Sequence, residues 1–312
     1  MNISKPKFWD KNKTFIFPIL LLPITILIYL VGNYKKLFIK KHFFPIPIIC
    51  IGNIYLGGTG KTPFSIKLFS ILKNLKKNPA FIRKKYEAFQ DEVKLQKKVG
   101  QIYENNKRAQ AIKEAIKNKV DVAILDDGFQ DFSINKNLSI ICFNEKQWIG
   151  NGFLIPSGPL RESLSSLKRA DYVIINGEKN INIEKKIFRE NKLIKIYYTR
   201  HEAINIDEFK NKKIISFAGI GNPINFFNLL SKNKMNLLDN LSFPDHYNYS
   251  EKELKDLIDK GKKNNAVLLT TEKDYFRIEN KYRENIRYLK IKVVIEKEEE
   301  FIGEIKKLYE NN

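Results

Sequence analysis

The chain has 312 residues, 43% of them hydrophobic and 12% aromatic, enough for one large domain or two smaller ones. It contains no repeat, Pro-rich linker or low-complexity tract, which excludes repeat and largely disordered proteins. The formal charge of +21 would suit a nucleic acid or an anionic membrane surface as partner. Only about nine of the basic residues are Arg. We therefore attribute the charge to a compositional bias that spreads Lys over every exposed face, rather than to a shaped basic patch. The few guanidinium groups are then informative, because they are hard to replace where phosphate is bound.

The N-terminal stretch Phe15–Val31, "FIFPILLLPITILIYLV", is uncharged and about 17 residues long, near the lower limit for a membrane-spanning helix. Pro18 and Pro23 disfavour a straight buried helix but are tolerated better in membranes. Lysines flank both sides, so charge does not set the orientation, and no small-residue cleavage site follows. We expect residues 1–40 to form an anchor that spans the membrane or lies in its interface. A buried core helix is the alternative.

A glycine-rich stretch, "GGTGKT" at residues 57–62, lies between a β-branched strand pattern and an amphipathic helix beginning near Thr62. Its glycines let backbone N–H groups surround phosphate oxygens at a helix N-terminus. Lys61 would reach the β- and γ-phosphates, and the Thr62 hydroxyl would bind Mg²⁺. The loop is a variant, because the strict pattern has glycine where this chain has Tyr55. The candidate ATP-binding residues are Tyr55, Leu56, Gly57, Gly58, Thr59, Gly60, Lys61 and Thr62.

A phosphate-binding loop of this kind also needs a carboxylate across the metal, at the end of a neighbouring hydrophobic strand. The stretch "VDVAILDDGFQD" predicts a strand over Val120–Leu125, followed by Asp126 and Asp127. Two adjacent carboxylates there can hold Mg²⁺ directly and through water. Asp-Asp-Gly is also a common turn, and the glycine-rich stretch could be a turn with an incidental lysine. The two motifs together predict a magnesium–nucleotide site.

The cysteines and histidines predict no metal cage. Cys50 and Cys142 lie in apolar runs and are typical of buried strand residues in a reducing compartment. His42, His201 and His246 are too far apart in the sequence for a zinc-binding pattern.

Four later stretches have unusual polar density. Residues 217–223 predict a second strand–turn–helix unit, and Ser250 with Glu253 predicts a helix capping box just after Asp245 and His246. The four stretches are "NGFLIPSGPLRE", "FAGIGNP", "FPDHYNYSEKE" and "LLTTEKD".

With these motifs the chain closely resembles one family, the lipid A tetraacyldisaccharide 4′-kinases. The matching elements occur in order: "GGTGKTP", "DDGFQ", "GNG…PSGPLRE…RADYVIING", "FAGIGNP", "FPDHY" and "TTEKD". They cover the chain from Pro45 to about Asp274, and the apolar N-terminus matches too. Many nucleotide triphosphatases share "GGTGKT", but its combination with "PSGPLRE" and "FPDHY" is specific.

The resemblance implies transfer of the γ-phosphoryl group of ATP, with Mg²⁺, to the 4′-hydroxyl of a tetraacyldisaccharide 1-phosphate, a lipid A precursor. The implied location is the cytoplasmic face of the bacterial inner membrane. Its partners would be the acylated acceptor and membrane lipid but no nucleic acid, and we expect a monomer. Because this acceptor cannot leave the bilayer, an anchor close to the phosphate loop is needed.

The implied fold is α/β. A P-loop α/β/α lobe would occupy residues 41–200, and a smaller α/β lobe over residues 201–312 would complete the active-site cleft. The N-terminal helix would be membrane-associated. The βα alternation before and after position 200 agrees with this division.

The resemblance also implies catalytic roles. The family's acidic "GDEP" element matches "FQDEVKL", so Asp91 would be the base toward the sugar hydroxyl and Glu92 a Mg²⁺ or water ligand. A carboxylate base suits a loose phosphoryl-transfer transition state, in which the proton leaves late. His246 would hydrogen-bond Asp91 and orient it, with Asp245 close behind. An ordinary acidic pair at a helix start, and a surface histidine, are the alternatives.

The chain departs from the family pattern before Asp91. The family's "SRGYGR" segment is shortened to "IRKKYEAF", which retains Arg83 and Tyr86, and Asp131 stands where the family usually has His. Arg108 and Arg161 are candidate substrate-binding groups for phosphate or an anionic headgroup.

Two other functional classes compete. A membrane-associated regulatory P-loop ATPase of the partitioning type usually carries a second Lys early in its loop, where this chain has Tyr55 and Leu56. A nucleic-acid-binding protein would need an Arg cluster, an aromatic RNA-binding motif or a zinc pattern, and the sequence has none of these.

Overall fold

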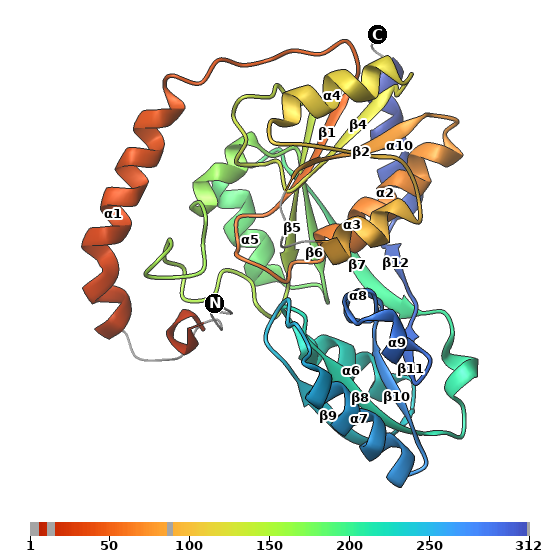
Figure 1. Cartoon of the computed structure of the whole chain (residues 1–312). Coiled ribbons are helices and arrows are strands. Elements are labelled where there is room, and N and C mark those ends of the chain that lie inside the picture. Colours follow the sequence, from red (N-terminus) through yellow and green to blue (C-terminus); the bar gives the residue numbers. More distant parts are fainter. Residues whose placement is uncertain (1–5, 11–15, 86–89, 311–312) are drawn as a thin grey trace. The chain divides into compact units, whose positions relative to one another are not determined.

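A computed structural model of the chain describes residues 6–10, 16–85 and 90–310. Tyr86, and Phe15 at the start of the predicted apolar stretch, lie outside the described residues. The chain divides into two compact units (Figure 1). The larger unit takes the described residues of 5–85, 99–200 and 295–312, and the smaller takes those of 86–98 and 201–294.

Each unit is therefore built from separate stretches of chain. The sequence predicts a single boundary between the two lobes, at residue 200. In the structure, residues 90–98 group with the later part of the chain and residues 295–310 with the earlier part. The predicted α/β fold with a larger and a smaller unit is confirmed.

An eight-stranded sheet, in the order β12-β7-β6-β5-β1-β4-β2-β3, lies mainly in the larger unit, whereas most of β12 and the end of β7 belong to the smaller unit. Its strands are β1 (Ile48–Gly52), β2 (Pro79–Lys84), β3 (Ile102–Asn105), β4 (Val122–Asp126), β5 (Leu138–Asn144), β6 (Tyr172–Asn176), β7 (Lys195–Ala203) and β12 (Ile291–Ile295). The neighbours from β7 to β3 pair in parallel. Central strands β1, β4 and β5 are buried at every residue, as expected of a parallel sheet covered on both faces. Cys50 and Cys142 are buried in β1 and β5 with free thiols, as predicted.

Helices cover both faces of this sheet (Figure 1). They are α2 (Lys61–Asn74), α4 (Arg108–Lys117), α5 (Ile181–Glu190) and α10 (Glu298–Glu310), with 3-10 turns at Lys7–Trp9 and Leu164–Arg169. On one face Phe64 of α2 meets Phe301 of α10, with ring centroids 5.8 Å apart. On the other, Ile112 of α4 and Ile187 of α5 share a buried cluster with Cys50 of β1. The core thus has helix–sheet–helix layers.

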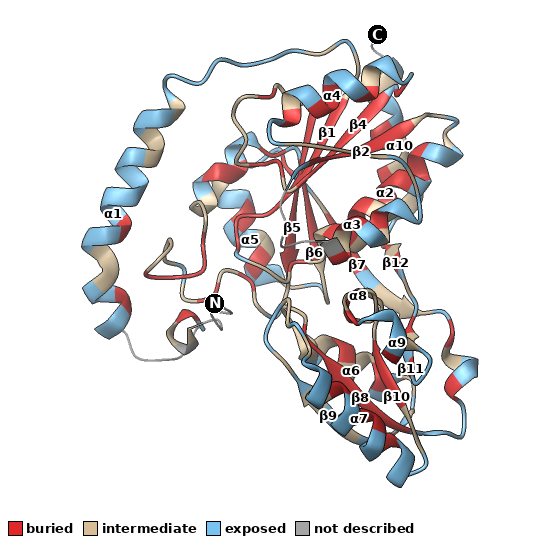
Figure 2. Ribbon diagram, in the orientation of Figure 1, coloured by how far each residue is buried: buried red, intermediate tan, exposed pale blue. Residues whose placement is uncertain are grey.

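Helix α1 (Ile16–Lys36) is the predicted apolar segment, and it extends beyond Val31 to Lys36. It has 21 residues, and its most apolar window has a mean hydropathy of 2.2. Only 11% of that window is buried, so the alternative of a core helix is wrong (Figure 2). By length and composition, the helix could cross a membrane.

A four-stranded sheet forms the smaller unit, in the order β11-β10-β8-β9 with parallel pairs. Its elements are α3 (Gln90–Lys97), a 3-10 turn (Ile206–Phe209), β8 (Lys213–Ala218), α6 (Pro223–Lys232), β9 (Asn236–Ser242), α7 (Glu251–Lys263), β10 (Ala266–Thr271), α8 (Glu272–Arg277), α9 (Asn280–Arg283) and β11 (Ile286–Leu289). The strand–turn–helix unit predicted over residues 217–223 is confirmed as β8 and α6. The capping box of Ser250 and Glu253 is also confirmed, at the start of α7.

Candidate active site

The phosphate loop, residues 57–62, runs from the turn after β1 into the first residues of α2. Gly57, Gly58 and Gly60 have φ angles of 82°, 57° and 86°. These left-handed conformations are open to glycine at little cost, which explains the glycines of the motif. Successive backbone N–H groups in such a loop, at a helix N-terminus, form a concave anion site.

Residues 159–161 are hydrogen-bonded to the backbone at the start of the phosphate loop. The Leu56 N–H donates to the carbonyl of Pro159 at 2.9 Å, and the Arg161 N–H donates to the carbonyl of Ile54 at 2.7 Å. Tyr55 is buried within this pairing and forms a bridge with Leu160. Tyr55 therefore serves as a core residue beneath the variant loop.

Asp126 is the last residue of β4 and lies in register with Ile51 of β1, just before the phosphate loop. Its Oδ2 atom is 3.1 Å from Nη1 of Arg83, and both residues are buried. A buried carboxylate needs a charged or hydrogen-bonding partner, and Arg83 supplies that partner at this strand end. This ion pair explains why Arg83 is retained in the shortened segment before Asp91.

Asp127 faces the loop lysine. Its two carboxylate oxygens each accept a hydrogen bond from Nη1 of Arg161 at 2.9 Å, and Nζ of Lys61 is 3.7 Å from Oδ1. Burial alone would raise the pKa of Asp127, but the charges of Lys61 and Arg161 outweigh it and lower that pKa. The structure thus brings together three residues predicted from separate motifs.

Arg108, at the start of α4, is buried and committed to the protein. Its Nη1 donates to Oδ2 of Asp131 at 3.2 Å, and its Nη2 donates to the carbonyl of Asp127 at 2.8 Å. Burial would raise the pKa of Asp131, but hydrogen bonds from Ser133 and the charge of Arg108 lower it. Asp131, at the family's histidine position, is therefore the anionic partner of Arg108.

The predicted magnesium ligands of the larger unit have the right chemistry. Mg²⁺ binds through one or two carboxylates together with substrate phosphates and water. Asp126 and Asp127 supply carboxylates beside the loop, and Thr62 supplies a hydroxyl in the first turn of α2. Among the residues that the structure describes, no group of three or more His, Cys, Asp or Glu forms a complete metal cage. The donor set suits a metal that arrives with nucleotide.

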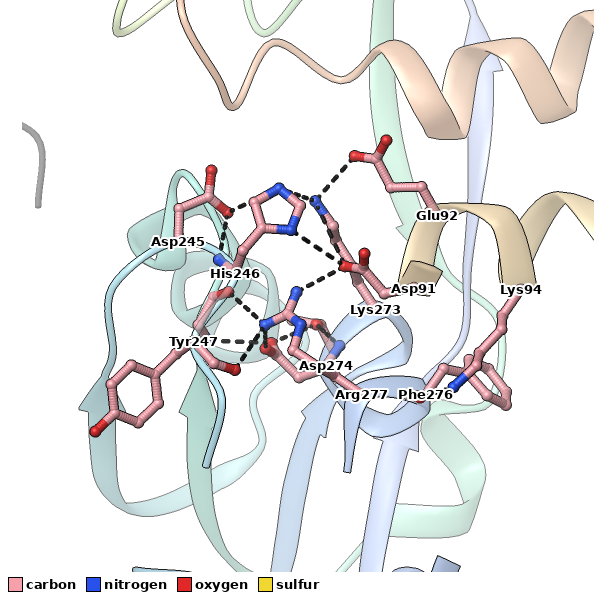
Figure 3. A network of polar contacts seen from close by, with 12 residues as sticks. Asp91, Glu92, Lys94, Asp245, His246, Tyr247, Lys273, Asp274, Phe276 and Arg277 are labelled. Atoms are coloured by element: carbon pink, nitrogen blue, oxygen red, sulfur yellow. Dashed lines mark hydrogen bonds and ion pairs between the residues drawn. The ribbon is translucent and has the colours of Figure 1, made fainter. Parts of the chain in front are cut away.

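In the smaller unit, Asp91 of α3 is the centre of a charged network (Figure 3). Its Oδ2 atom is 2.7 Å from Nη2 of Arg277, 3.6 Å from Nδ1 of His246 and 3.8 Å from Nζ of Lys273. Burial would raise the pKa of Asp91, but the His246 hydrogen bond and the charges of Lys273 and Arg277 hold it far below its usual range. Asp91 is therefore a carboxylate at every physiological pH.

His246 and Glu92 complete this network. His246 has a φ of 56°, and its N–H donates to the carbonyl of Gly219 at 3.1 Å and to Oδ1 of Asp245 at 3.0 Å. These bonds fix a left-handed turn that aims the ring at Asp91 (Figure 3). Glu92 accepts a 3.0 Å hydrogen bond from Lys273, so its role as a metal or water ligand stays a prediction.

Arg277 is a further residue of this network, and no motif in the sequence predicts it. Its guanidinium joins Asp91 to Asp274 and also donates to the carbonyls of Gly219 and Tyr247. The scarcity of arginine in this chain was the signal that could have found it, because a guanidinium kept against the composition indicates a specific anion to bind.

A parallel strand, a glycine loop and a helix, with an acidic pair at the end of the adjacent strand, define a P-loop nucleotide-binding protein. Residues 13–310 match the family model described as Tetraacyldisaccharide-1-P 4'-kinase, LpxK. The chain belongs to this family.

Relatives and a solved structure agree with that assignment. The chain is 43% identical to the tetraacyldisaccharide 4'-kinase of Pelagibacter ubique over the full length of both proteins. It is 33% identical to that of Rickettsia bellii, over 88% of this chain and 89% of the relative. The crystal structure of LpxK from Aquifex aeolicus in complex with ATP is similar with a TM-score of 0.73 and 25% identity, over 94% of this chain and 99% of that one.

Proposed function

We propose that the protein transfers the γ-phosphoryl group of ATP to the 4′-hydroxyl of a tetraacyldisaccharide 1-phosphate, a lipid A precursor. We place this reaction at the cytoplasmic face of the bacterial inner membrane and assign it to a monomer. The observation that carries the proposal is the convergence of Lys61, Asp127 and Arg161 beside a glycine loop of the required shape. The relative crystallised with ATP supports the choice of nucleotide.

On the nucleotide side, residues 55–62 would hold the phosphates of ATP. Lys61 and Arg161 now share the carboxylate of Asp127, and phosphate oxygens would replace that carboxylate as their partner. Thr62, Asp126 and Asp127 would hold Mg²⁺, which neutralises phosphate charge during transfer. We assign Arg161 to the transferred phosphate or the acceptor, whereas Arg108, which is bonded to Asp131 and to the Asp127 carbonyl, would hold the Asp127 segment in position.

On the acceptor side, we assign Asp91 the role of base toward the 4′-hydroxyl. Its low pKa makes it a weak base but keeps it ionised and able to accept the hydroxyl hydrogen bond. That property suits a loose transition state, in which the hydroxyl loses its proton late and orientation matters most. His246 would orient the Asp91 carboxylate, and Glu92 would bind metal or water.

Membrane association would come from α1, whose large apolar side chains are mostly exposed (Figure 2). Four acyl chains keep the acceptor in the bilayer, so an enzyme held at the surface meets it at high effective concentration. We propose residues 1–40 as the anchor, the larger unit as the P-loop kinase lobe and the smaller unit as the second lobe of the enzyme.

The decisive experiment combines the detergent-solubilised protein with ATP, Mg²⁺ and a tetraacyldisaccharide 1-phosphate. We expect a product carrying a second phosphate, and no product from Lys61→Met, which lacks the charge that meets the β- and γ-phosphates. A regulatory P-loop ATPase would instead release inorganic phosphate without modifying the lipid, and that result would refute the proposal.

A further inference from the structure

The guanidinium of Arg277, the last residue of α8, is bound by four groups of the smaller unit (Figure 3). Its Nη2 atom donates to Oδ2 of Asp91 at 2.7 Å, and its Nη1 atom donates to Oδ1 of Asp274 at 2.9 Å. Nη1 also donates to the carbonyls of Gly219 and Tyr247, at 3.0 Å and 3.3 Å. One amino group of the guanidinium is therefore fixed to the fold, and the other holds the proposed base.

Asp274 is a rigid partner for this guanidinium. It is fully buried, and its carboxylate accepts hydrogen bonds from the Thr271 hydroxyl at 2.7 Å, the Gly219 N–H at 3.1 Å and the Tyr249 hydroxyl at 3.1 Å. With Arg277, these donors occupy the roughly four positions at which a carboxylate can accept a hydrogen bond. Turning either the Asp274 carboxylate or the guanidinium would leave a buried donor or acceptor without a partner, which is costly.

The carbonyl of Gly219 connects Arg277 to His246. It accepts from Nη1 of Arg277 and, at 3.1 Å, from the N–H of His246. A Cβ atom at position 219 would lie 3.0 Å from Cβ of Tyr247, so glycine permits this close packing. Gly219, Tyr247 and Asp274 belong to the motifs "FAGIGNP", "FPDHY" and "TTEKD". These three motifs therefore meet at Arg277.

The contacts of Asp91 favour one of its two carboxylate oxygens. Arg277, His246 and Lys273 each make their closest approach to Oδ2, at 2.7 Å, 3.6 Å and 3.8 Å (Figure 3). Within residues 6–10, 16–85 and 90–310, no group donates a hydrogen bond to Oδ1. The two oxygens of an unrestrained carboxylate exchange easily, because the torsion that relates them is broad. With Oδ2 held, Oδ1 is the oxygen left to accept a hydrogen from a ligand.

A planar guanidinium can transmit orientation, whereas a point charge cannot. The angle between Nη1 and Nη2 is fixed by the planar group, so the bonds that hold Nη1 also determine where Nη2 lies. Nη2 in turn fixes the rotation of the Asp91 carboxylate through its 2.7 Å bond to Oδ2. A lysine ammonium would supply the charge but would leave the direction open.

We propose that Arg277 and Asp274 are positioning residues, which hold the Asp91 carboxylate so that its Oδ1 atom takes the proton of the acceptor hydroxyl. This inference rests on the proposed function and deepens it, because it names the oxygen that acts as base and the residues that orient it. As the hydroxyl oxygen bonds to the γ-phosphorus, the bond from that phosphorus to the β,γ-bridging oxygen breaks and ADP leaves with the electron pair. The hydroxyl proton passes to Oδ1 and from there to water.

The informative variant is Arg277→Lys, which keeps the positive charge and loses the planar group. An error of about 1 Å in the placement of a catalytic group can cost about 10²-fold, so kcat should fall by about tenfold to a hundredfold. The KM for ATP should change less than about twofold, because the lost interaction acts on the transition state. Arg283→Lys is the matched control, since Arg283 lies in the same unit and donates to the carbonyls of Phe276 and Ile278, and it should keep the wild-type kcat. A normal kcat in Arg277→Lys would overturn the proposal, because charge alone would then be sufficient.

A positioning residue acts through its target, so its effect should vanish with the target. In an Asp91→Ala background, Arg277→Lys should lower kcat no further, as for residues that act as one unit. Asp274→Asn keeps the size of the buried side chain but loses its charge, and its loss of kcat should not add to that of Arg277→Lys. Tyr249→Phe, which removes one donor to Asp274, replaces Asp274→Asn in this comparison if that variant does not fold. Multiplicative losses in either pair would overturn the proposal, because they would show a role apart from Asp91.

The orientation of Asp91 can be measured without any phosphoryl transfer. In a high-resolution crystal structure of Arg277→Lys, the Asp91 carboxylate should be rotated or occupy two orientations, and in Arg283→Lys it should lie as in the wild type. An unchanged single orientation in Arg277→Lys would overturn the proposal, because the carboxylate would not need the guanidinium. A wild type that transfers no phosphate to the acceptor would refute the proposed function, whereas this structural comparison would still decide whether Arg277 positions Asp91.

Discussion

The charge of Lys273 is one of the causes that lower the pKa of Asp91, after the hydrogen bond to His246, and replacing Lys273 should move the acid limb of the pH–activity profile. Asp91 can accept a proton only when it is ionised. Activity that depends on it is present above its folded-state pKa and is lost as the pH falls through that value. In the wild type the pKa lies well below the ordinary carboxyl range. We expect Lys273→Met to raise this pKa and therefore to shift the acid limb upward.

The size of the shift follows from the geometry. Nζ of Lys273 is 3.8 Å from Oδ2 of Asp91, and two unit charges about 4 Å apart interact by about 4 kcal/mol at an effective dielectric of about 20. That energy corresponds to about 3 pKa units. The Lys273 side chain is 21% exposed, so water screens part of it. We therefore expect a rise of about one to two units, toward the usual carboxyl value near about 4.

The measurement is kcat/KM against pH, which reports groups of the free enzyme. Lys98→Met is the matched control, because Lys98 makes a 3.0 Å ion pair with Glu272 in the same unit. Lys94→Met is the second control, because Lys94 lies on the same helix as Asp91 and its Nζ donates to the carbonyl of Phe276 at 3.0 Å. Both controls should keep the acid limb of the wild type.

Stability gives an independent measurement with the same sign. A carboxyl group with a depressed folded-state pKa stabilises the fold above its unfolded-state pKa, and this contribution is lost as the pH falls toward the folded-state value. Raising the pKa of Asp91 by one to two units should cost about 1.4–2.7 kcal/mol at pH 7. The difference between wild type and Lys273→Met should shrink below about pH 4. An acid limb at one pH in all four enzymes would refute the argument.

Three further predictions concern the metal, the anchor and the proposed catalytic pair. Asp126→Asn and Asp127→Asn should each raise the Mg²⁺ concentration needed for half-maximal activity, with at least one variant nearly inactive, because the metal neutralises γ-phosphate charge. Unchanged Mg²⁺ titrations in both would mean that the acidic pair is only a turn. Deleting residues 1–34 should release the protein from membranes and lower activity on the bilayer-embedded acceptor more than basal ATP hydrolysis. Unaltered partitioning in a flotation assay would contradict this role of α1. Asp91→Ala should lower kcat by about 10²–10⁴ with little change in ATP affinity, and adding His246→Asn should lower it little further. Asn is chosen because it tolerates the φ of 56° at this position, and fully multiplicative losses would show that the two residues act independently.

The phosphate loop and the acidic strand end could be predicted because their chemistry is local in the sequence. Glycines, Lys61 and Thr62 lie within one turn and the start of one helix, and Asp126 ends a strand with a continuous apolar pattern. The contacts around Asp91 depend on the tertiary fold. Arg277 is 186 residues away from Asp91, and no periodicity relates positions so far apart.

The bonding of the arginines was also hidden from the sequence. A guanidinium near a phosphate-binding motif suggests a phosphate ligand, yet Arg83 and Arg108 are buried against Asp126 and Asp131. Burial decides whether an arginine binds a phosphate ligand or a carboxylate of the protein, because a buried guanidinium needs an anionic partner that is always present.

Contacts near the N-terminus connect the proposed anchor helix α1 to the phosphate loop. Thr25, in the middle of the helix, is hydrogen-bonded to Ser157 at 2.7 Å, and Trp9 donates to the carbonyl of Pro156 at 3.1 Å. The same stretch continues to Pro159, whose carbonyl accepts from Leu56 at the start of the phosphate loop. The segment from Pro156 to Pro159 therefore contacts both the apolar helix and the start of the phosphate loop. If α1 lies in the bilayer, this segment holds the phosphate loop at a fixed distance from the membrane surface. Such a distance is needed because the acceptor stays in the membrane and must be reached there.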